Sequence, residues 1–215
     1  MIVVVDYGMG NLRSVQKAFE RLGHSVEVSG DPKRILTASH VVLPGVGAFT
    51  AGMRQLNERG LVSAIRVAID RGTPFLGICL GMQLLMSESE EFGRHQGLGV
   101  IPGRVIGFPS GSSAMAGLKV PHMGWNIVDF RPGVPATSGL SDHAYYYFVH
   151  SFYAVPDDPA VVAGETTYGI RFASVLVKDH IVACQFHPEK SQSMGRLLLE
   201  RFLTVSAASA HAPSS

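Results

Sequence analysis

A chain of 215 residues with 46% hydrophobic and 16% charged residues is long and apolar enough to bury a large core. A formal net charge of +1 without a Lys/Arg cluster argues against a nucleic-acid partner. No apolar run reaches about 18 residues and the start has no signal-peptide pattern, so we expect no membrane association. Two cysteines cannot form a disulfide framework, which favours the reducing cytoplasm.

The first part of the chain alternates strand and helix patterns. The β-branched run 2–5 is typical of a strand buried on both faces, and Asn11 and Asp31-Pro32 are typical helix starts. We expect strands at 2–5, 25–28 and 40–43, and helices at 12–22, from 32 onward, and at 61–71. Strands that alternate with helices through short connections predict βαβ units and a parallel sheet.

A glycine-containing loop, 43–49, follows the third expected strand. Gly45 and Gly47 permit unusual backbone angles, which could turn an N–H toward a reacting carbonyl group. An ordinary strand-to-helix turn or an anion-binding loop is also possible here. The loop lacks the glycine and lysine spacing of a phosphate-binding loop.

Cys79 lies between an apolar strand pattern, 74–78, and a helix pattern, 80–86. Gly77 and Gly81 flank it at two residues on either side, as in the sharp elbow that exposes a nucleophile at the carboxyl edge of a sheet. The first N–H groups of the following helix would then point at the sulfur atom. An inert buried cysteine is the alternative for this segment by itself.

Beyond residue 86 the pattern changes to strands without intervening helices. We expect strands at 98–106, 125–129, 145–153, 161–167, 173–177 and 181–186, with a hairpin over 175–182. Residues 109–117 are expected to form a loop, and 191–205 a last helix. We predict one domain over 1–205 and a disordered tail over 206–215.

The segment 185–189 reads Gln-Phe-His-Pro-Glu. Pro188 favours extended geometry at His187, and in an extended chain His187 and Glu189 point the same way. Cys79, His187 and Glu189 would then be nucleophile, general base and orienting carboxylate. Alternatively, the segment is a surface start of the last helix, with Glu189 near its positive end.

Together these groups resemble the class I (triad) glutamine amidotransferases, with GICLGMQ at 77–83 and FHPE at 186–189. Further stretches resemble the glutaminase subunits of imidazole glycerol phosphate synthase, at 6–14, 44–49, 121–126, 146–151 and 186–191. The resemblance covers nearly the whole chain except the tail and the Ser-rich loop near 110. It implies an α/β, flavodoxin-like class I glutamine amidotransferase fold, whose central, mostly parallel sheet is flanked by helices and carries an antiparallel extension.

The resemblance also implies residue roles. Cys79 would attack the side-chain amide of glutamine, His187 would pass a proton to the departing ammonia, and Glu189 would orient His187. The oxyanion hole would be formed at Leu80 and at Val46 and Gly47, in a loop that would have to flip. The residues expected to hold the rest of the glutamine substrate are Gly47, Gln83, Glu91, Val149, His150 and Ser151. No cofactor or metal is implied.

A partner subunit is the last implication of the resemblance. Ammonia released into water is largely protonated, and in this family a separate (β/α)8-barrel cyclase receives it through an internal channel. The joint reaction forms imidazole glycerol phosphate in histidine biosynthesis. We expect a heterodimer, with Met123, Trp125, Tyr147 and Lys190 on the docking face.

Three other readings remain open. A different amidotransferase glutaminase would keep the triad but would not be expected to carry DYGMGNLRS or PHMGWN, at 6–14 and 121–126. A cysteine hydrolase of the same architecture is disfavoured by Gln83 and the FHPE segment. A non-catalytic binding subunit would need a defect in the geometry of the triad.

Overall fold

The structure, a computed structural model, describes residues 1–141 and 143–206. Its helices are α1 (Leu12–Glu20), α2 (Pro32–Leu36), α3 (Phe49–Glu58), α4 (Leu61–Asp70), α5 (Leu80–Leu84) and α6 (Gln192–Leu203). The strands of the first half are β1 (Ile2–Val5), β2 (Val26–Ser29), β3 (His40–Gly45), β4 (Phe75–Cys79), β5 (Met86–Ser89) and β6 (His95–Gln96). The later strands are β7 (Ile101–Gly107), β8 (His122–Phe130), β9 (Ala144–His150), β10 (Phe152–Pro156), β11 (Val162–Tyr168), β12 (Ile170–Lys178) and β13 (Ile181–Cys184).

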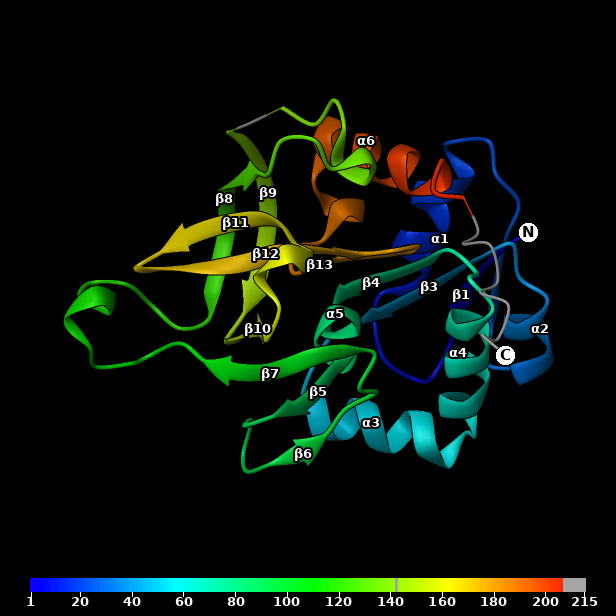
Figure 1. The fold of residues 1–215 in the computed structure, drawn as a ribbon, viewed down its shortest axis with the longest axis horizontal. Helices are drawn as coiled ribbons and strands as arrows, with labels where there is room; N and C mark the ends of the chain where they lie inside the picture. The colour runs from blue at the N-terminus through cyan, green and yellow to red at the C-terminus, as the bar shows by residue number, and fades with distance from the viewer. Residues whose placement is uncertain (142, 207–215) are drawn as a thin grey trace, which may run out of the picture.

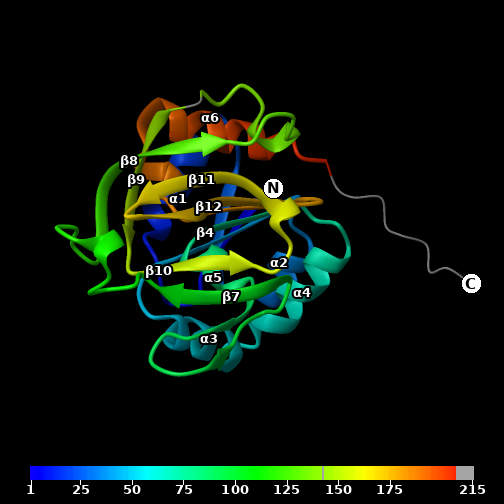
Figure 2. The same ribbon diagram turned by 60° about the vertical axis from the view of Figure 1, so that its left-hand side comes forward.

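The strands pair in the order β2-β1-β3-β4-β13-β12-β10-β7-β5-β6 (Figure 1). The stretch from β2 to β13 is parallel, and β12 joins β13 as an antiparallel hairpin. β11 pairs with β12 and β8, and β8 pairs with β9, which builds the antiparallel extension. Figure 2 shows β7 and β10 side by side within the same sheet. The expected α/β architecture is confirmed.

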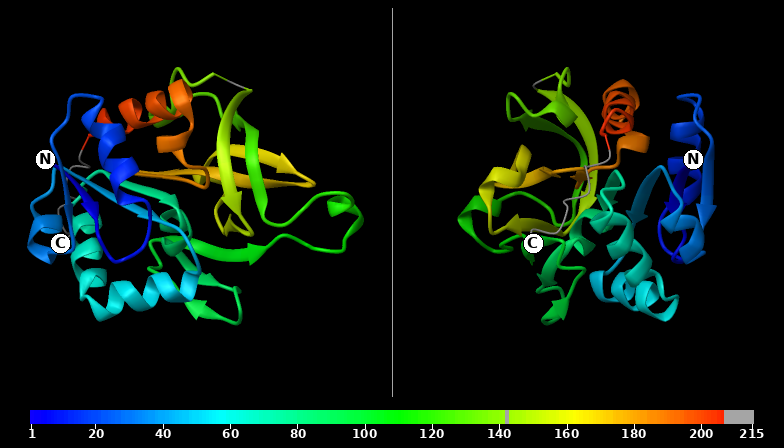
Figure 3. Two further views of the ribbon diagram at one scale, coloured as in Figure 1. Left: turned by 180° about the vertical axis from the view of Figure 1, so that it is seen from behind. Right: turned by 45° about the vertical axis from the view of Figure 1, so that its right-hand side comes forward.

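Helices cover both faces of the parallel strands. In β1, Val3 and Val5 pack in one apolar cluster with residues of α2, α3 and α4, whereas Ile2 and Val4 pack in a second cluster with residues of α1 and α6. Successive side chains of a strand point to opposite faces, so a strand covered on both sides is apolar throughout. Figure 1 and the rear view in Figure 3 show α1 and α6 on one side and α3 and α4 on the other.

The expected helix starts are confirmed in detail. The Asn11 side chain accepts a hydrogen bond from the N–H of Ser14, and the Asp31 side chain accepts one from the N–H of Lys33. These side chains satisfy N–H groups that have no partner within the first helical turn. Helix α1 ends at Glu20, earlier than expected, before Gly23 with a φ of +83°.

Some elements differ from the sequence-based expectation. Helix α3 and strands β5 and β6 were not anticipated. The single strand expected over 145–153 is two strands, β9 and β10, which pair with different neighbours. The expected loop at 109–117 contains a short 3-10 turn, Ser113–Met115. The disorder expected for 206–215 concerns residues that, except for Ser206, lie outside the described part of the chain.

Candidate active site

Cys79 ends β4 and immediately precedes α5, in the elbow that the sequence predicts. Its φ of +54° is unusual for a residue with a side chain. A Cβ at Gly81 would lie 1.7 Å from the carbonyl oxygen of Leu43, and one at Gly77 would lie 3.0 Å from the backbone of Gly81. The two glycines are therefore required for the close approach of α5 to the strands.

Neighbouring strands bring the other candidate groups to the same sheet edge. Gly45 at the end of β3 lies opposite Cys79 in the parallel register, and Cys184 at the end of β13 lies opposite Ile78. The loop that follows β3 and the segment that follows β13 must therefore both emerge beside Cys79. This edge is where parallel sheets usually bind their ligands.

His187 and Glu189 form a buried pair. Nδ1 of His187 lies 2.8 Å from Oε1 of Glu189, and the two side chains are only 3% and 2% exposed. Burial lowers the pKa of His187, but its contacts with Cys79 and Glu189 and the charges of these groups outweigh burial and raise it to about 9. The arrangement favours an imidazolium that lies between the sulfur atom and the carboxylate.

The opposite ring nitrogen of His187, Nε2, has no partner within strict hydrogen-bond geometry among the described residues. The interaction with Cys79 that raises the pKa of His187 therefore falls outside regular hydrogen-bond geometry. Catalytic hydrogen bonds of this kind often tighten only when the substrate binds.

Strand β9 holds the histidine segment in place. The N–H of His187 donates to the carbonyl of Tyr147 over 2.9 Å. The Ser191 hydroxyl donates to the carbonyl of His187 over 2.7 Å and accepts from the N–H of Tyr147 over 3.0 Å. These bonds satisfy the buried backbone and fix the position of the ring.

The His187 and Glu189 side chains come together for a different reason than the one that the sequence suggested. His187 is extended, as expected, but Pro188–Lys190 is a 3-10 turn and not a continued extended chain. The turn, rather than strand alternation, returns the Glu189 carboxylate to the imidazole. The last helix, α6, begins only at Gln192.

A cavity of about 380 Å³ opens over Cys79. Its lining contains every residue predicted for the oxyanion hole and for substrate binding. The lining residues are Val46, Gly47, Cys79, Leu80, Gln83, Glu91, Phe92, Pro121, Val149, His150, Ser151 and Phe152. Five separate stretches of the chain therefore meet at one site, although the roles of their residues stay predictions.

Glu91 has a second, structural contact. Its Oε2 accepts a hydrogen bond of 2.6 Å from the N–H of Phe49, the first residue of α3. The residue before α3, Ala48, cannot cap the helix with its side chain. Glu91 thus ties the start of α3, and with it the loop that carries Val46 and Gly47, to the wall of the cavity.

Two residues at the candidate site were not anticipated from the sequence. The Nε2 of Gln185 lies 3.7 Å from Sγ of Cys79, and Gln185 is completely buried. Phe92, 84% exposed with a φ of +54°, lies at the cavity. Gln185 is the first residue of the segment Gln-Phe-His-Pro-Glu, 185–189, but a glutamine at this position gives no indication in the sequence of a contact with Cys79.

The four residues predicted for the docking face lie beside the cavity. Trp125 pairs with Tyr147 across β8 and β9 with their rings 6.0 Å apart, and Nζ of Lys190 lies 5.5 Å from the Tyr147 ring centre. Met123, 62% exposed, pairs with Val149 of the cavity lining. We call Met123, Trp125, Tyr147 and Lys190 the aromatic cluster. Exposed apolar groups of this kind are typical of interaction surfaces.

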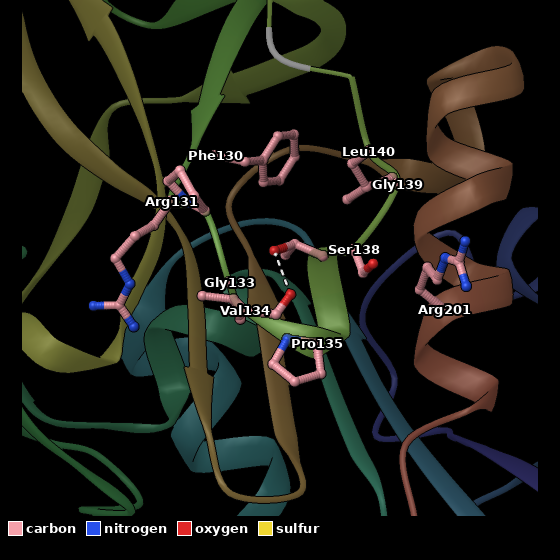
Figure 4. Close-up of a pocket in the computed structure, with 11 residues that line it drawn as sticks. Phe130, Arg131, Gly133, Val134, Pro135, Ser138, Gly139, Leu140 and Arg201 are labelled. Carbon is pink, nitrogen blue, oxygen red and sulfur yellow. Dashed lines mark hydrogen bonds between the residues drawn. The ribbon is translucent and has the colours of Figure 1, made fainter.

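A larger hollow of about 650 Å³ lies between the segment 130–140 and α6. Figure 4 shows Arg201 on α6 across from Phe130 and Arg131. Among the residues that the structure describes, this hollow shares no lining residue with the cavity over Cys79 and is lined by no cysteine or histidine. The smaller cavity is therefore the candidate active site. Within the described residues, no helix combines the length and apolarity needed to cross a membrane.

Solved structures with low sequence identity share this fold. A structure described as a glutamine amidotransferase superimposes with a TM-score of 0.71 at 19% identity, covering 94% of this chain and 99% of that one. The structure of PurLQS from Thermotoga maritima gives a TM-score of 0.71 at 17% identity, covering 94% of this chain and 96% of that one.

Several curated proteins have a much higher sequence identity to this chain than these structures do. Residues 3–205 match the family described as "Glutamine amidotransferase class-I". Imidazole glycerol phosphate synthase subunit HisH of Geobacter sulfurreducens is 54% identical, over 94% of this chain and 97% of that protein. The HisH subunit of Aquifex aeolicus is 51% identical, over 93% of this chain and 94% of that protein. The chain therefore belongs to the class-I glutamine amidotransferase family and, within it, to the HisH subunits of imidazole glycerol phosphate synthase.

Proposed function

We propose that Cys79, His187 and Glu189 are the catalytic triad with which this amidotransferase subunit hydrolyses glutamine for histidine biosynthesis. The observation that carries the proposal is the buried His187–Glu189 pair of 2.8 Å, which lies close enough to Cys79 for the sulfur to help raise the pKa of the imidazole. A buried carboxylate fixes the tautomer of the histidine and stabilises its protonated form. The strained elbow at Cys79 presents the sulfur to the cavity.

The reaction follows from these positions. The Cys79 thiolate attacks the side-chain amide carbon of glutamine, and the carbonyl oxygen becomes an oxyanion. His187 transfers its proton to the nitrogen, the carbon–nitrogen bond breaks, and ammonia leaves a glutamyl thioester on Cys79. Water then attacks the thioester with His187 as general base, and glutamate and the free thiol are released.

The cavity lining supplies the remaining roles. The N–H of Leu80, directly after the nucleophile, is placed to stabilise the oxyanion, together with an N–H from Val46 or Gly47. The φ of +100° at Gly47 gives this loop the backbone freedom that a peptide flip requires. Gly47, Gln83, Glu91 and Val149–Ser151 would hold the α-amino and α-carboxylate groups of glutamine.

We further propose that a separate (β/α)8-barrel cyclase docks on the aromatic cluster and receives the ammonia before water protonates it. The cluster supports this proposal because Met123 pairs with Val149, which places the exposed surface at the edge of the cavity. The cyclase would use the ammonia to convert a phosphoribulosyl formimino aminoimidazole carboxamide ribotide into imidazole glycerol phosphate and an aminoimidazole carboxamide ribotide. The proposed complex is a cytoplasmic heterodimer.

A chloroketone analogue of glutamine tests the proposed nucleophile. We expect one covalent adduct, located at Cys79 by peptide mass spectrometry and suppressed by excess glutamine. Cys79→Ala should give no adduct, whereas Cys184→Ala should still give one because Cys184 is completely buried. An adduct at Cys184, or none in the wild type, would contradict the proposal and would favour a binding subunit without catalysis.

A further inference from the structure

Gln185 is a buried polar side chain that the triad mechanism does not use. It follows β13 directly, two residues before His187, and is 0% exposed. Its Nε2 lies 3.7 Å from Sγ of Cys79, within the range of a hydrogen bond to sulfur. A buried amide must find partners for its N–H groups, so the direction of this contact can be worked out from its neighbours.

The orientation of the Gln185 amide is fixed by Gln83. The side chain of Gln83 lies 2.9 Å from the carbonyl oxygen of Phe152, and because a carbonyl only accepts, Gln83 must present its Nε2 there. The same Nε2 lies 3.0 Å from Oε1 of Gln185 and donates its second hydrogen to it. The oxygen of Gln185 is thereby occupied, and its N–H group faces the sulfur.

The carbonyl of Phe152 is anchored from the other side. It also accepts a hydrogen bond of 2.9 Å from Nδ1 of His150, so Nε2 of His150 is left to accept from Nδ1 of His122, 2.9 Å away. Nε2 of His122 in turn accepts from the amide of Asn126 over 3.1 Å. Burial lowers the pKa of His150 to about 3 and that of His122 to about 4, so both rings are neutral.

This chain of bonds has one consistent direction for every hydrogen. Asn126 donates to His122, His122 to His150, and His150 to the Phe152 carbonyl. Gln83 donates to the same carbonyl and to Gln185, and Gln185 donates to Cys79. A reversed amide at Gln185 would turn its oxygen toward the sulfur and its NH2 group toward Nε2 of Gln83, so that two donors would face each other without an acceptor.

We propose that Gln185 is a further catalytic residue, a hydrogen-bond donor that holds the Cys79 thiolate in position for attack. Gln83 acts as its positioning residue. An amide suits this role because it stabilises negative charge on the sulfur without taking part in proton transfer, which stays with His187. The inference rests on the proposed function of Cys79 as nucleophile.

The test is the pH dependence of Cys79 alkylation by iodoacetamide, which requires no bound glutamine. Gln185→Leu removes the donor, and Gln185→Glu keeps an acceptor for Gln83 but brings a carboxylate to the sulfur. We expect Gln185→Leu to slow alkylation at pH 7 about tenfold and to move the midpoint of the profile up by about one pH unit. Gln185→Glu should move the midpoint further, because a like charge disfavours the thiolate.

Cys184→Ala is the matched control, since it alters the neighbouring buried position on β13 without removing the donor. It should keep the wild-type profile. Unchanged profiles in both Gln185 variants, even with a lowered melting temperature, would overturn the inference and leave a structural role only. If Gln185→Leu does not fold, the near-isosteric Gln185→Glu variant decides alone.

The two proposals fail separately. If Cys79→Ala still releases ammonia from glutamine, the proposed function is wrong and the inference falls with it. If Cys79→Ala is inactive and wild-type Cys79 is alkylated, but neither Gln185 variant changes the profile, only the role of Gln185 is overturned.

Discussion

Nδ1 of His187 and Oε1 of Glu189 are 2.8 Å apart in a site where neither side chain is more than 3% exposed. A turn, Pro188–Lys190, lies between them and returns the carboxylate to the ring. This relationship gives the histidine a fixed tautomer and a charge partner, and the predictions about the triad depend on it.

Replacing Glu189 by glutamine removes the negative charge of the His187–Glu189 pair but keeps nearly the same side-chain shape. We expect Glu189→Gln to keep the fold but to lower kcat for glutamine at least about a hundredfold, because the imidazolium loses its charge partner. The pKa of His187, measured by NMR titration, should also fall. The matched control is Glu58→Gln on the exposed face of α3, which should change neither quantity. A normal kcat in Glu189→Gln would contradict the role of the carboxylate.

The stability of the protein should depend on His187 in a defined pH window. Its pKa in the folded state, about 9, is above the ordinary value of 6.5, so its contribution is complete below pH 6.5 and is lost as the pH rises through 9. The advantage of wild type over His187→Asn in unfolding free energy should therefore shrink by about 3 kcal/mol between pH 6 and pH 10.

His40 offers an internal control for that experiment. Burial lowers the pKa of His40, so its effect on stability changes as the pH falls below 6.5 and not above it. In urea unfolding, the difference between wild type and His40→Asn should be constant from pH 7 to pH 10. A constant difference for His187→Asn over the same range would show that its charged form is not stabilised by folding.

The elbow should not tolerate a methyl group. A Cβ at Gly81 would lie 1.7 Å from the backbone oxygen of Leu43, so Gly81→Ala must push α5 away from β3. We expect a loss of at least about 2 kcal/mol in unfolding free energy, or failure to fold. Gly107→Ala is the control, because its Cβ would meet only the Phe152 ring at 3.3 Å. Equal stability of the two variants would refute the close approach.

The aromatic cluster should govern affinity for the cyclase subunit. Trp125 is 47% exposed and packs edge-on against Tyr147, so Trp125→Ala should raise the Kd of the complex at least about tenfold. Trp125→Phe, which keeps an aromatic face, should retain most of the affinity. Isothermal titration calorimetry of the two variants measures both effects, and an unchanged Kd in Trp125→Ala would place the interface elsewhere.

Local patterns predicted the parallel half of the fold well. The buried strand β1 and the helix caps Asn11 and Asp31 are formed by residues that are close together in the sequence, so their patterns can be recognised in the sequence itself. The elbow at Cys79 was equally visible, because its glycines have a steric role that few other patterns share.

What the sequence could not reveal depends on distant contacts. Helix α3 begins at Phe49 without a side-chain cap from Ala48, and the N–H of Phe49 is satisfied by Glu91, 42 residues further along the chain. The role of Gln185 likewise depends on a contact with Cys79 across 106 residues. The sequence predicted one strand over 145–153, where the structure has two, β9 and β10. Periodicity does not reveal where a chain changes its pairing partner.

The most direct test of the central claim is ammonia release from glutamine by the full chain, with and without the cyclase subunit and its nucleotide substrate. We predict slow release by the chain alone, strong activation when both partners are present, and no release in Cys79→Ala under any condition. Release that persists in Cys79→Ala would contradict the triad. Rapid release without the cyclase would contradict the partnership and indicate a stand-alone amidase.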